Sequence, residues 1–359
     1  MSPDTTRMET HRQQPDSGEQ PVPPSAADKR PDWRERARER RQRLVQFGDV
    51  FHVATFVVAE FVARVVPERH WRGVSLAFAR ASLAARRFRV RGAIARLDAN
   101  LGGRIPDELN RRTLLASIVG AFFEERVFFH KAAHDPAWRP NVRLDGGELL
   151  DAALAAGRGA VIWVAPMIFS TLLVKIALHD AGHRVAHLSV PWHGPARTRF
   201  GRWLVNARAV VVEERFVERI IIPMDGRAGA VLDELGQRVR SNRIVTITAV
   251  DNANKPLEAP FLRGSLRLGP GAPRLALSHR APLFAAILAR DAAGAFCVKL
   301  HPLTSMDTGT AVDTMNGFAR AFADAYARGV IESPALWKID PRPRTRRPTD
   351  SAVAGGHRQ

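Results

Sequence analysis

Between Val142 and Leu303, short apolar runs alternate with stretches of helical spacing, and this alternation restricts the fold class more than any other pattern in the sequence. Apolar strands that alternate with helices favour a mixed, mostly parallel sheet covered by helices. We therefore expect an α/β domain over residues 141–341. The predicted strands are residues 160–165, 184–190, 207–214, 219–224, 243–250, 282–290 and 295–303, and the predicted helices are residues 170–181, 228–240, 272–278 and 312–328.

The residues before this region have a different character. Residues 1–46 are polar, end in an arginine-dense run and lack the pattern of a cleavable secretion signal, so we expect a disordered basic tail. Residues 75–131 carry apolar side chains three and four positions apart, with arginines on the opposite face, which predicts helices. We expect residues 47–140 to form a membrane-associating helical region and residues 342–359 to form a second disordered tail.

One predicted helix, residues 51–66, is almost wholly apolar but contains Glu60. At about 1.5 Å per residue it would span roughly 24 Å, which is short of a hydrocarbon core of about 30 Å. A basic run precedes it and Trp71 follows it, as in helices that lie in the membrane interface. The sequence therefore favours an interfacial helix, and an ordinary buried helix is the alternative.

The chain of 359 residues has a formal net charge of +18, which favours contact with a polyanion: nucleic acid, anionic lipid or an acidic carrier protein. Part of this excess also fits an Ala/Arg-rich composition without functional meaning. With one tyrosine and no zinc-finger pattern, nucleic acid is not the expected partner. The single cysteine, Cys297, excludes an intrachain disulfide, and its apolar surroundings predict a buried thiol.

Several short patterns follow one another in a fixed order between Ser75 and Asp340. Arginine-rich helices with an Asn-Leu pair precede a helix that ends in AFFEERVFF, and the strand pattern GRGAVIWV comes next. The segment AVDNANKPLEAPFLRGSLRLGPGAPRLALSHRAPLFAAILAR and the ending ESPALWKIDPR follow. Their order and spacing resemble those of the bacterial lipid A biosynthesis acyltransferases, which are lauroyl and myristoyl transferases of the lysophospholipid acyltransferase superfamily.

This resemblance implies a glycerolipid acyltransferase-like sheet and a protein at the cytoplasmic face of the bacterial inner membrane, held there as a peripheral or monotopic protein. It implies transfer of a fatty acyl chain from acyl carrier protein or acyl-CoA to a hydroxyl of a glycolipid or phospholipid, as in lipid A-type biosynthesis. The implied partners are a membrane lipid, the acyl donor and an anionic membrane surface. No cofactor or metal is expected beyond the thioester co-substrate.

The chain departs from the family directly after the first strand. There the family carries a His, four residues and then Asp or Glu; the His removes the proton of the acceptor hydroxyl and the acid orients the ring. Aligned on GRGAVIWV, those positions are Ala165 and Ser170, which can do neither job. The remaining candidates are His193 as a displaced base, Asp251 as its orienting acid and Ser170 as a hydrogen-bond donor. A relative that binds a lipid or an acyl carrier without turnover is the alternative.

Other candidate residues bind rather than react. Arginines after the second strand suit a lipid phosphate, because guanidinium groups pair bidentately with phosphate oxygens. A Gly/Pro turn offers free amides to a phosphate or an oxyanion, or is purely structural. Asp251 also fits a turn cap. The expected substrate-binding residues are Arg197, Arg199, Arg202, Arg263, Gly269 and Gly271.

Two histidine patterns invite other interpretations. His130 and Asp135 repeat the family's His-x4-Asp spacing, but they follow a helix upstream of the sheet and more simply mark a helix end. His179, His183 and His187 are four apart, yet Gly182 ends the predicted helix between them. We expect surface histidines there and no zinc site.

Overall fold

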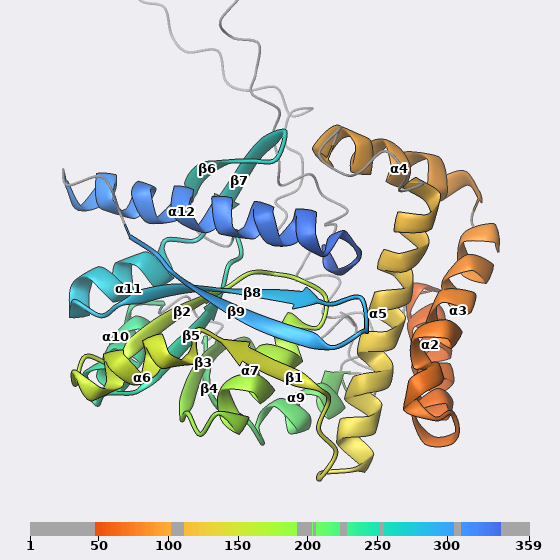
Figure 1. Cartoon of the computed structure of the whole chain (residues 1–359), viewed down its shortest axis with the longest axis horizontal. Coiled ribbons are helices and arrows are strands. Elements are labelled where there is room, and N and C mark those ends of the chain that lie inside the picture. Colours follow the sequence, from red (N-terminus) through yellow and green to blue (C-terminus); the bar gives the residue numbers. More distant parts are fainter. Residues whose placement is uncertain are drawn as a thin grey trace, which may run out of the picture.

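The computed structural model describes residues 47–85, 87–101, 111–191, 203, 206–222, 228–251, 255–304 and 310–338. Within them, a layer of N-terminal helices stands against one end of a sheet that is covered by helices on both faces (Figure 1). The prediction of an α/β fold with a mixed, mostly parallel sheet is confirmed.

The main sheet has seven strands in the order β1-β9-β8-β2-β5-β3-β4. The five strands β8, β2, β5, β3 and β4 are parallel, β9 runs antiparallel to β8, and β1 is parallel to β9. A separate antiparallel hairpin is formed by β6 and β7. The strands are β1 Val142–Asp145, β2 Ala160–Val164, β3 Val185–Ser189, β4 Glu218–Ile221, β5 Ile244–Thr248, β6 Leu257–Phe261, β7 Gly264–Leu268, β8 Leu283–Arg290 and β9 Phe296–Pro302.

The connections between the parallel strands place the helices in two layers. The crossovers from β2 to β3 and from β3 to β4 run in one direction across the sheet, and those from β4 to β5 and from β5 to β8 run in the other. Right-handed crossovers therefore put α7 and α9 on one face and α10 and α11 on the opposite face. Helix α12 packs against β8, β6 and α11. The helices are α6 Gly147–Ala155, α7 Ser170–Asp180, α9 Ala207–Glu213, α10 Ala228–Arg240, α11 Gly271–His279 and α12 Ala311–Glu332.

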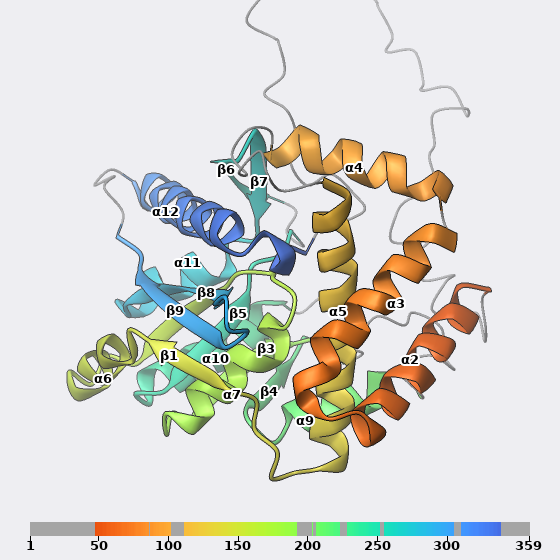
Figure 2. The same ribbon diagram turned by 45° about the vertical axis from the view of Figure 1, so that its right-hand side comes forward.

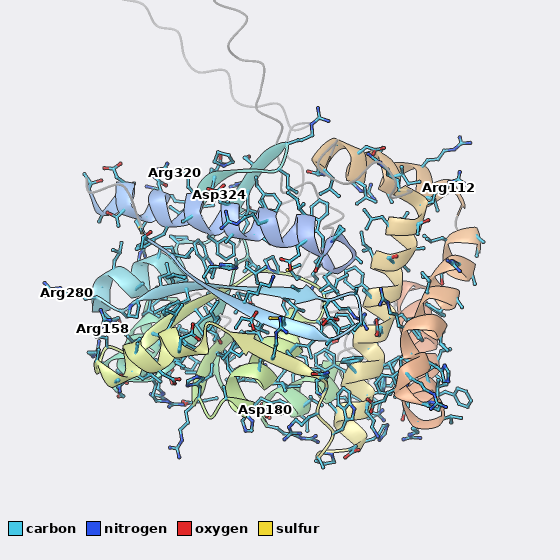
Figure 3. The ribbon with its side chains drawn as sticks, viewed as in Figure 1. Arg112, Arg158, Asp180, Arg280, Arg320 and Asp324 are labelled. Atoms are coloured by element: carbon cyan, nitrogen blue, oxygen red, sulfur yellow. The ribbon has the colours of Figure 1, made fainter. Side chains whose placement is uncertain are left out.

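Strands covered on both faces need apolar side chains at every position. All residues of β2 are buried, and so are all residues of β8 except Arg290. The Trp163 ring of β2 lies 4.4 Å from the Phe322 ring of α12, measured between centroids, so this helix is anchored on the central strand. Charged side chains project from the outer surface of the protein instead, as Figure 3 shows for Arg158, Asp180, Arg280 and Arg320.

The N-terminal helices pack around the long helix α5. Figure 2 shows α2 and α3 side by side with α5, and α4 at its upper end. Helix α5 also contacts α9 and the short helix η4, so it lies across the edge of the sheet at which the parallel strands end. The elements are α2 Phe47–Val65, η2 Glu68–His70, α3 Trp71–Ala85, α4 Arg87–Leu101, α5 Arg111–His134 and η4 Pro334–Leu336.

One predicted strand is wrong. Residues 207–214, read as a strand because of their β-branched run, form α9 and the first residue after it. Val212 and Glu213 are buried while Val211 is exposed, and helix packing against α5 outweighs the local β propensity. The sequence prediction also omitted β1, α6 and the β6–β7 hairpin, and it ended α12 too early.

Among the described residues, none of the helices combines the length and the apolar character needed to cross a bilayer.

Candidate functional site

The carboxyl ends of β2 and β5 form the edge at which an open α/β sheet usually places its binding crevice. These two strands are neighbours, and the amide of Ala249 beyond β5 donates to the carbonyl of Val164 at the end of β2. The chain leaves β2 toward α7 on one face, whereas after β5 it continues toward α11 on the other face. In open α/β sheets, adjacent strands whose connections diverge in this way mark the usual ligand position, so we expect the binding crevice here.

The turn from β2 to α7, residues 165–169, has an unusual backbone. Phe169 adopts the left-handed conformation with φ 67° and ψ −15°, although it is a large residue without exposed surface. A bulky residue with positive φ is strained, and such strain persists only where the surroundings enforce it. Phe169 also supplies no side-chain cap to α7. This turn is therefore held in shape by other parts of the chain.

The first of these parts is α5. The Glu125 carboxylate accepts a hydrogen bond from the Phe169 amide, with Oε1 and N 2.7 Å apart. The carboxylate therefore lies at the N-terminus of α7, where a negative charge is favourable. Desolvation nevertheless raises the pKa of Glu125 above its ordinary value, against the opposing effects of Lys338, of the Phe169 amide and of Arg126. A carboxylate whose pKa is raised is a stronger proton acceptor than an ordinary glutamate.

The C-terminal part of the chain holds the other side of the turn. The Ile168 amide donates to the Leu336 carbonyl over 2.8 Å, and Met167 forms a β-bridge with Trp337. The Tyr326 hydroxyl of α12 donates to the Pro166 carbonyl over 3.2 Å. Segments far apart in the sequence thus fix one short turn.

Ala165 and Ser170, the residues aligned with the resembling family's His and acid, lie at the start of this turn and directly after it. Ala165 has 0% of its surface exposed and Ser170 has 3%. The Ser170 hydroxyl donates to the Met167 carbonyl over 2.7 Å, so its proton is committed to the turn. Neither residue presents a reactive group to solvent in this structure.

Other sequence-predicted residues lie around the same strand ends. Asp251 follows β5, and its Oδ2 is 3.4 Å from a guanidinium nitrogen of Arg267 on β7. The Gly269 amide donates to the Val250 carbonyl over 3.0 Å, and Gly271 begins α11. Arg263 is exposed in the β6–β7 turn and its amide donates to the Asn100 carbonyl at the end of α4. The candidates His193, Arg197, Arg199 and Arg202 lie outside the described residues.

A buried ionic cluster adjoins the crevice on the face covered by α7 and α9. Lys175 Nζ of α7 is 3.0 Å from Glu213 Oε2 of α9, and their side chains are 4% and 0% exposed. Burial lowers the pKa of Lys175, against the effect of Glu213. The Arg219 guanidinium of β4 lies 4.0 Å from the same carboxylate oxygen and donates to the hydroxyl of Ser189, the last residue of β3. Buried, mutually dependent charges of this kind concentrate near functional sites.

His130 and Asp135, which repeat the His-x4-Asp spacing, have separate structural roles. Asp135 accepts from the Ala137 and Trp138 amides and pairs with Lys131, which confirms a role at the end of α5. His130 lies well inside α5 and is buried against the Phe56 ring; burial lowers its pKa to about 4. The expectation that His130 caps the helix end is therefore wrong.

His179, His183 and His187 differ in their exposure to solvent. His179 is exposed and pairs with Asp180, as expected for a surface residue. His183 and His187 are buried, which corrects the expectation of surface positions. His187 lies on β3 inside the sheet, where the Thr246 hydroxyl, 2.9 Å from its Nδ1, gives the buried ring a hydrogen-bond partner. Cys297 is buried and burial raises the pKa of its thiol, as predicted for a structural residue.

Glu125 is the residue of this turn that sequence reasoning missed. Its signal is present in AFFEERVFF, where two adjacent acids stand in an otherwise apolar helical stretch. Both acids bind partners inside the protein. Glu124 forms a bidentate ion pair with Arg290, and Glu125 accepts the hydrogen bond from the Phe169 amide. No protein-family model matches the chain, and a search among curated proteins finds no match.

Proposed function

We propose that this protein is a membrane-associated acyltransferase that moves a fatty acyl chain from acyl carrier protein or acyl-CoA to a hydroxyl of a glycolipid or phospholipid, as in lipid A-type biosynthesis. The observation that carries the proposal is the Glu125 carboxylate at the β2–α7 turn. Acyl transfer to a hydroxyl requires a proton acceptor, and this acid lies beside the positions where the resembling family keeps one. The connections that follow β2 and β5 leave toward opposite faces of the sheet, which supports a binding crevice at the same place.

In the proposed reaction, Glu125 acts as the general base. The acceptor hydroxyl loses its proton to the carboxylate as its oxygen attacks the thioester carbonyl, and a tetrahedral intermediate forms. Collapse of this intermediate breaks the carbon–sulfur bond, and the leaving thiolate takes the proton back from the Glu125 carboxyl. The raised pKa makes the Glu125 carboxylate a stronger base for the first of these two transfers than an ordinary glutamate would be.

The other candidates have supporting roles in this proposal. Ser170 stabilises the turn through its bond to Met167. Asp251 follows β5 and pairs with Arg267, and the Gly269 amide donates to the neighbouring Val250 carbonyl. His193 remains a second candidate base. The arginines 197, 199 and 202 remain candidates for the lipid phosphate, and Arg263 is placed on the exposed hairpin turn.

An exposed apolar face of α2 supports the membrane association. Val57, Val58, Phe61 and Val65 lie three or four positions apart or adjacent, and all are exposed. Such a face on a helix suits the boundary between headgroups and acyl chains, and the excess of positive charge suits an anionic surface. We place this surface at the cytoplasmic face of the bacterial inner membrane, in a peripheral or monotopic arrangement.

The direct test is acyl transfer by the full chain. Purified protein is incubated with radiolabelled acyl-acyl carrier protein or acyl-CoA and with vesicles that contain glycolipid or phospholipid acceptors. We expect an acylated lipid from the wild-type protein and a rate about 10²–10⁴-fold lower from Glu125→Gln, the usual effect of removing a general base. An unchanged rate in Glu125→Gln together with a lost rate in His193→Ala would transfer the base role to His193.

A second function, lipid or acyl-carrier binding without turnover, is favoured by one observation. Ala165 and Ser170 are both buried, and neither can act as the family's pair does. The same experiment separates the two functions. Lipid or acyl carrier that copurifies with the chain, with no acylated product from any donor, would establish binding alone.

A further inference from the structure

A second group of chemically capable side chains lies away from the crevice, where α2, α5 and α9 meet. Glu60 comes from α2, whereas His130 and His134 are one helical turn apart on α5. Their ligand atoms all lie within 4.8 Å of one another. Glu60 Oε1 and His134 Nε2 are 3.2 Å apart.

These residue types and spacings suit a divalent transition-metal ion. Two histidines at i and i+4 present their rings on one face of a helix, and a carboxylate from a second helix completes a three-ligand set. Zinc ligands lie about 2.0–2.2 Å from the ion, so neighbouring ligand atoms are roughly 3.3 Å apart. The pair of Glu60 and His134 already has this separation, and the remaining ligand atoms need only modest side-chain rotation.

A cation already pairs with two members of this group. Arg208 Nη1 of α9 lies 3.0 Å from Glu60 Oε2 and 3.5 Å from His130 Nδ1. Because the guanidinium can only donate, the His130 Nδ1 lone pair points toward it. The Glu60 carboxylate and the His130 ring thus direct electron pairs at one positively charged point.

The site is open to solvent on one side. The side chains of Glu60, His134 and Arg208 are 19%, 31% and 40% exposed, while His130 is buried at the bottom. The Phe56 ring packs edge-on against the His130 ring and limits its orientation. An ion can therefore enter from the surface, and Arg208 must leave Glu60 and the Phe56 ring, whose centroid lies 5.1 Å from its Cζ, to make room for it.

We propose that Glu60, His130 and His134 form a binding site for a divalent transition-metal ion of the Zn²⁺ class, which displaces Arg208 and keeps a fourth position for water. Three protein ligands with one open position are the arrangement of exchangeable rather than closed zinc sites. The ion would join α2, whose outer face is apolar, to α5, which holds the β2–α7 turn. This inference is independent of acyl transfer.

The test is calorimetric titration of the metal-free full chain with ZnCl₂, with MgCl₂ as the comparison because hard cations prefer all-oxygen sites. We expect one stoichiometric Zn²⁺ site and no heat of specific binding with Mg²⁺. His134→Ala and Glu60→Gln should each weaken Zn²⁺ binding by at least about 100-fold, because even outer-shell partners contribute roughly 10–100-fold. His179→Ala removes a comparable exposed histidine that also pairs with an acid, and should leave the affinity unchanged.

A further variant makes the inference sharper. Arg208→Met removes the guanidinium shared by Glu60 and His130 and leaves Arg64, whose Nη2 is 2.8 Å from Glu60 Oε1. We expect tighter Zn²⁺ binding than in the wild-type chain. Circular dichroism melting of each apo variant identifies any loss of folding, and Arg208→Met tests the site without removing a ligand. Equal Zn²⁺ affinity in His134→Ala and His179→Ala, or no gain in Arg208→Met, would overturn the proposal.

Discussion

The Glu125 carboxylate and the Phe169 amide are 2.7 Å apart, and this hydrogen bond joins the N-terminal helices to the turn that follows the central strand β2. It places an acid with a raised pKa beside a residue held at positive φ. Strain and a desolvated acid at one point both lower stability. Both costs occur together at the carboxyl edge of the sheet, where the proposed acyl transfer would take place.

Glu125→Gln should therefore raise stability while it removes activity. The amide oxygen of Gln still accepts from Phe169, but no charge has to be desolvated. Because the folded-state pKa of Glu125 is raised, the folded chain binds the proton more tightly, and wild-type stability falls as pH rises through the interval from the ordinary glutamate pKa to the raised value. Melting curves should show the largest gain for Glu125→Gln above that interval and a vanishing gain below it. The neighbouring Glu124→Gln is the matched control and should lose stability, because Arg290 keeps a partly buried charge without its bidentate partner.

The two glycines of GRGAVIWV should respond differently to alanine. Both have positive φ, but a Cβ on Gly157 would meet nothing within 4 Å, whereas one on Gly159 would lie 2.5 Å from the Val239 carbonyl oxygen. Gly157→Ala should cost about 1–2 kcal/mol from the backbone conformation alone. Gly159→Ala should cost about 1–3 kcal/mol more, because the backbone of α10 must move. Urea unfolding of both variants gives the comparison, and equal losses would exclude the close approach of β2 to α10.

The buried pair of Lys175 and Glu213 should behave as a unit. Lys175→Met leaves the Glu213 charge buried and should cost about 3–5 kcal/mol, the usual effect of breaking a buried ion pair. The double variant Lys175→Met/Glu213→Leu removes both charges and should recover much of this loss. A double-mutant cycle by denaturant unfolding measures the coupling. Additive losses would mean that the two side chains act separately.

The exposed face of α2 should decide vesicle binding. Val57 and Val312 are each 57% exposed, the first on α2 and the second near the start of α12. Val57→Glu should weaken sedimentation with anionic vesicles, because a charge then replaces apolar surface at the membrane boundary. Val312→Glu should have no such effect. If both variants sediment as the wild type does, α2 is not the membrane-contacting element.

The sheet was predictable because its strands are short apolar runs bounded by turns. Residues 160–165 and 282–290 became β2 and β8 almost as predicted, since burial on both faces leaves a clear signal in the sequence. Residues 207–214 failed for the opposite reason. Their valines favour a strand locally, but contacts with α5, which come from distant sequence, make them helical.

The candidate site was only partly predictable for a related reason. The sequence indicates that the β2–α7 turn matters and that Ala165 and Ser170 lack a base. It does not reveal Glu125, because the side chain comes from a helix 44 positions away in sequence and reaches the turn only through packing. Two adjacent acids within an apolar helix predict that the acids are buried and bind other parts of the protein. They do not show which residue each acid binds.

The turn after β2 takes part of its support from residues far along the chain. The Ile168 amide donates to the Leu336 carbonyl and Met167 pairs with Trp337, so the turn lacks these contacts until residues 336 and 337 have been translated. A nascent chain can assemble β2 and α7 early, since domains begin to fold during synthesis. The turn at residues 165–169, however, takes its final form only after residues 336 and 337 have left the ribosome.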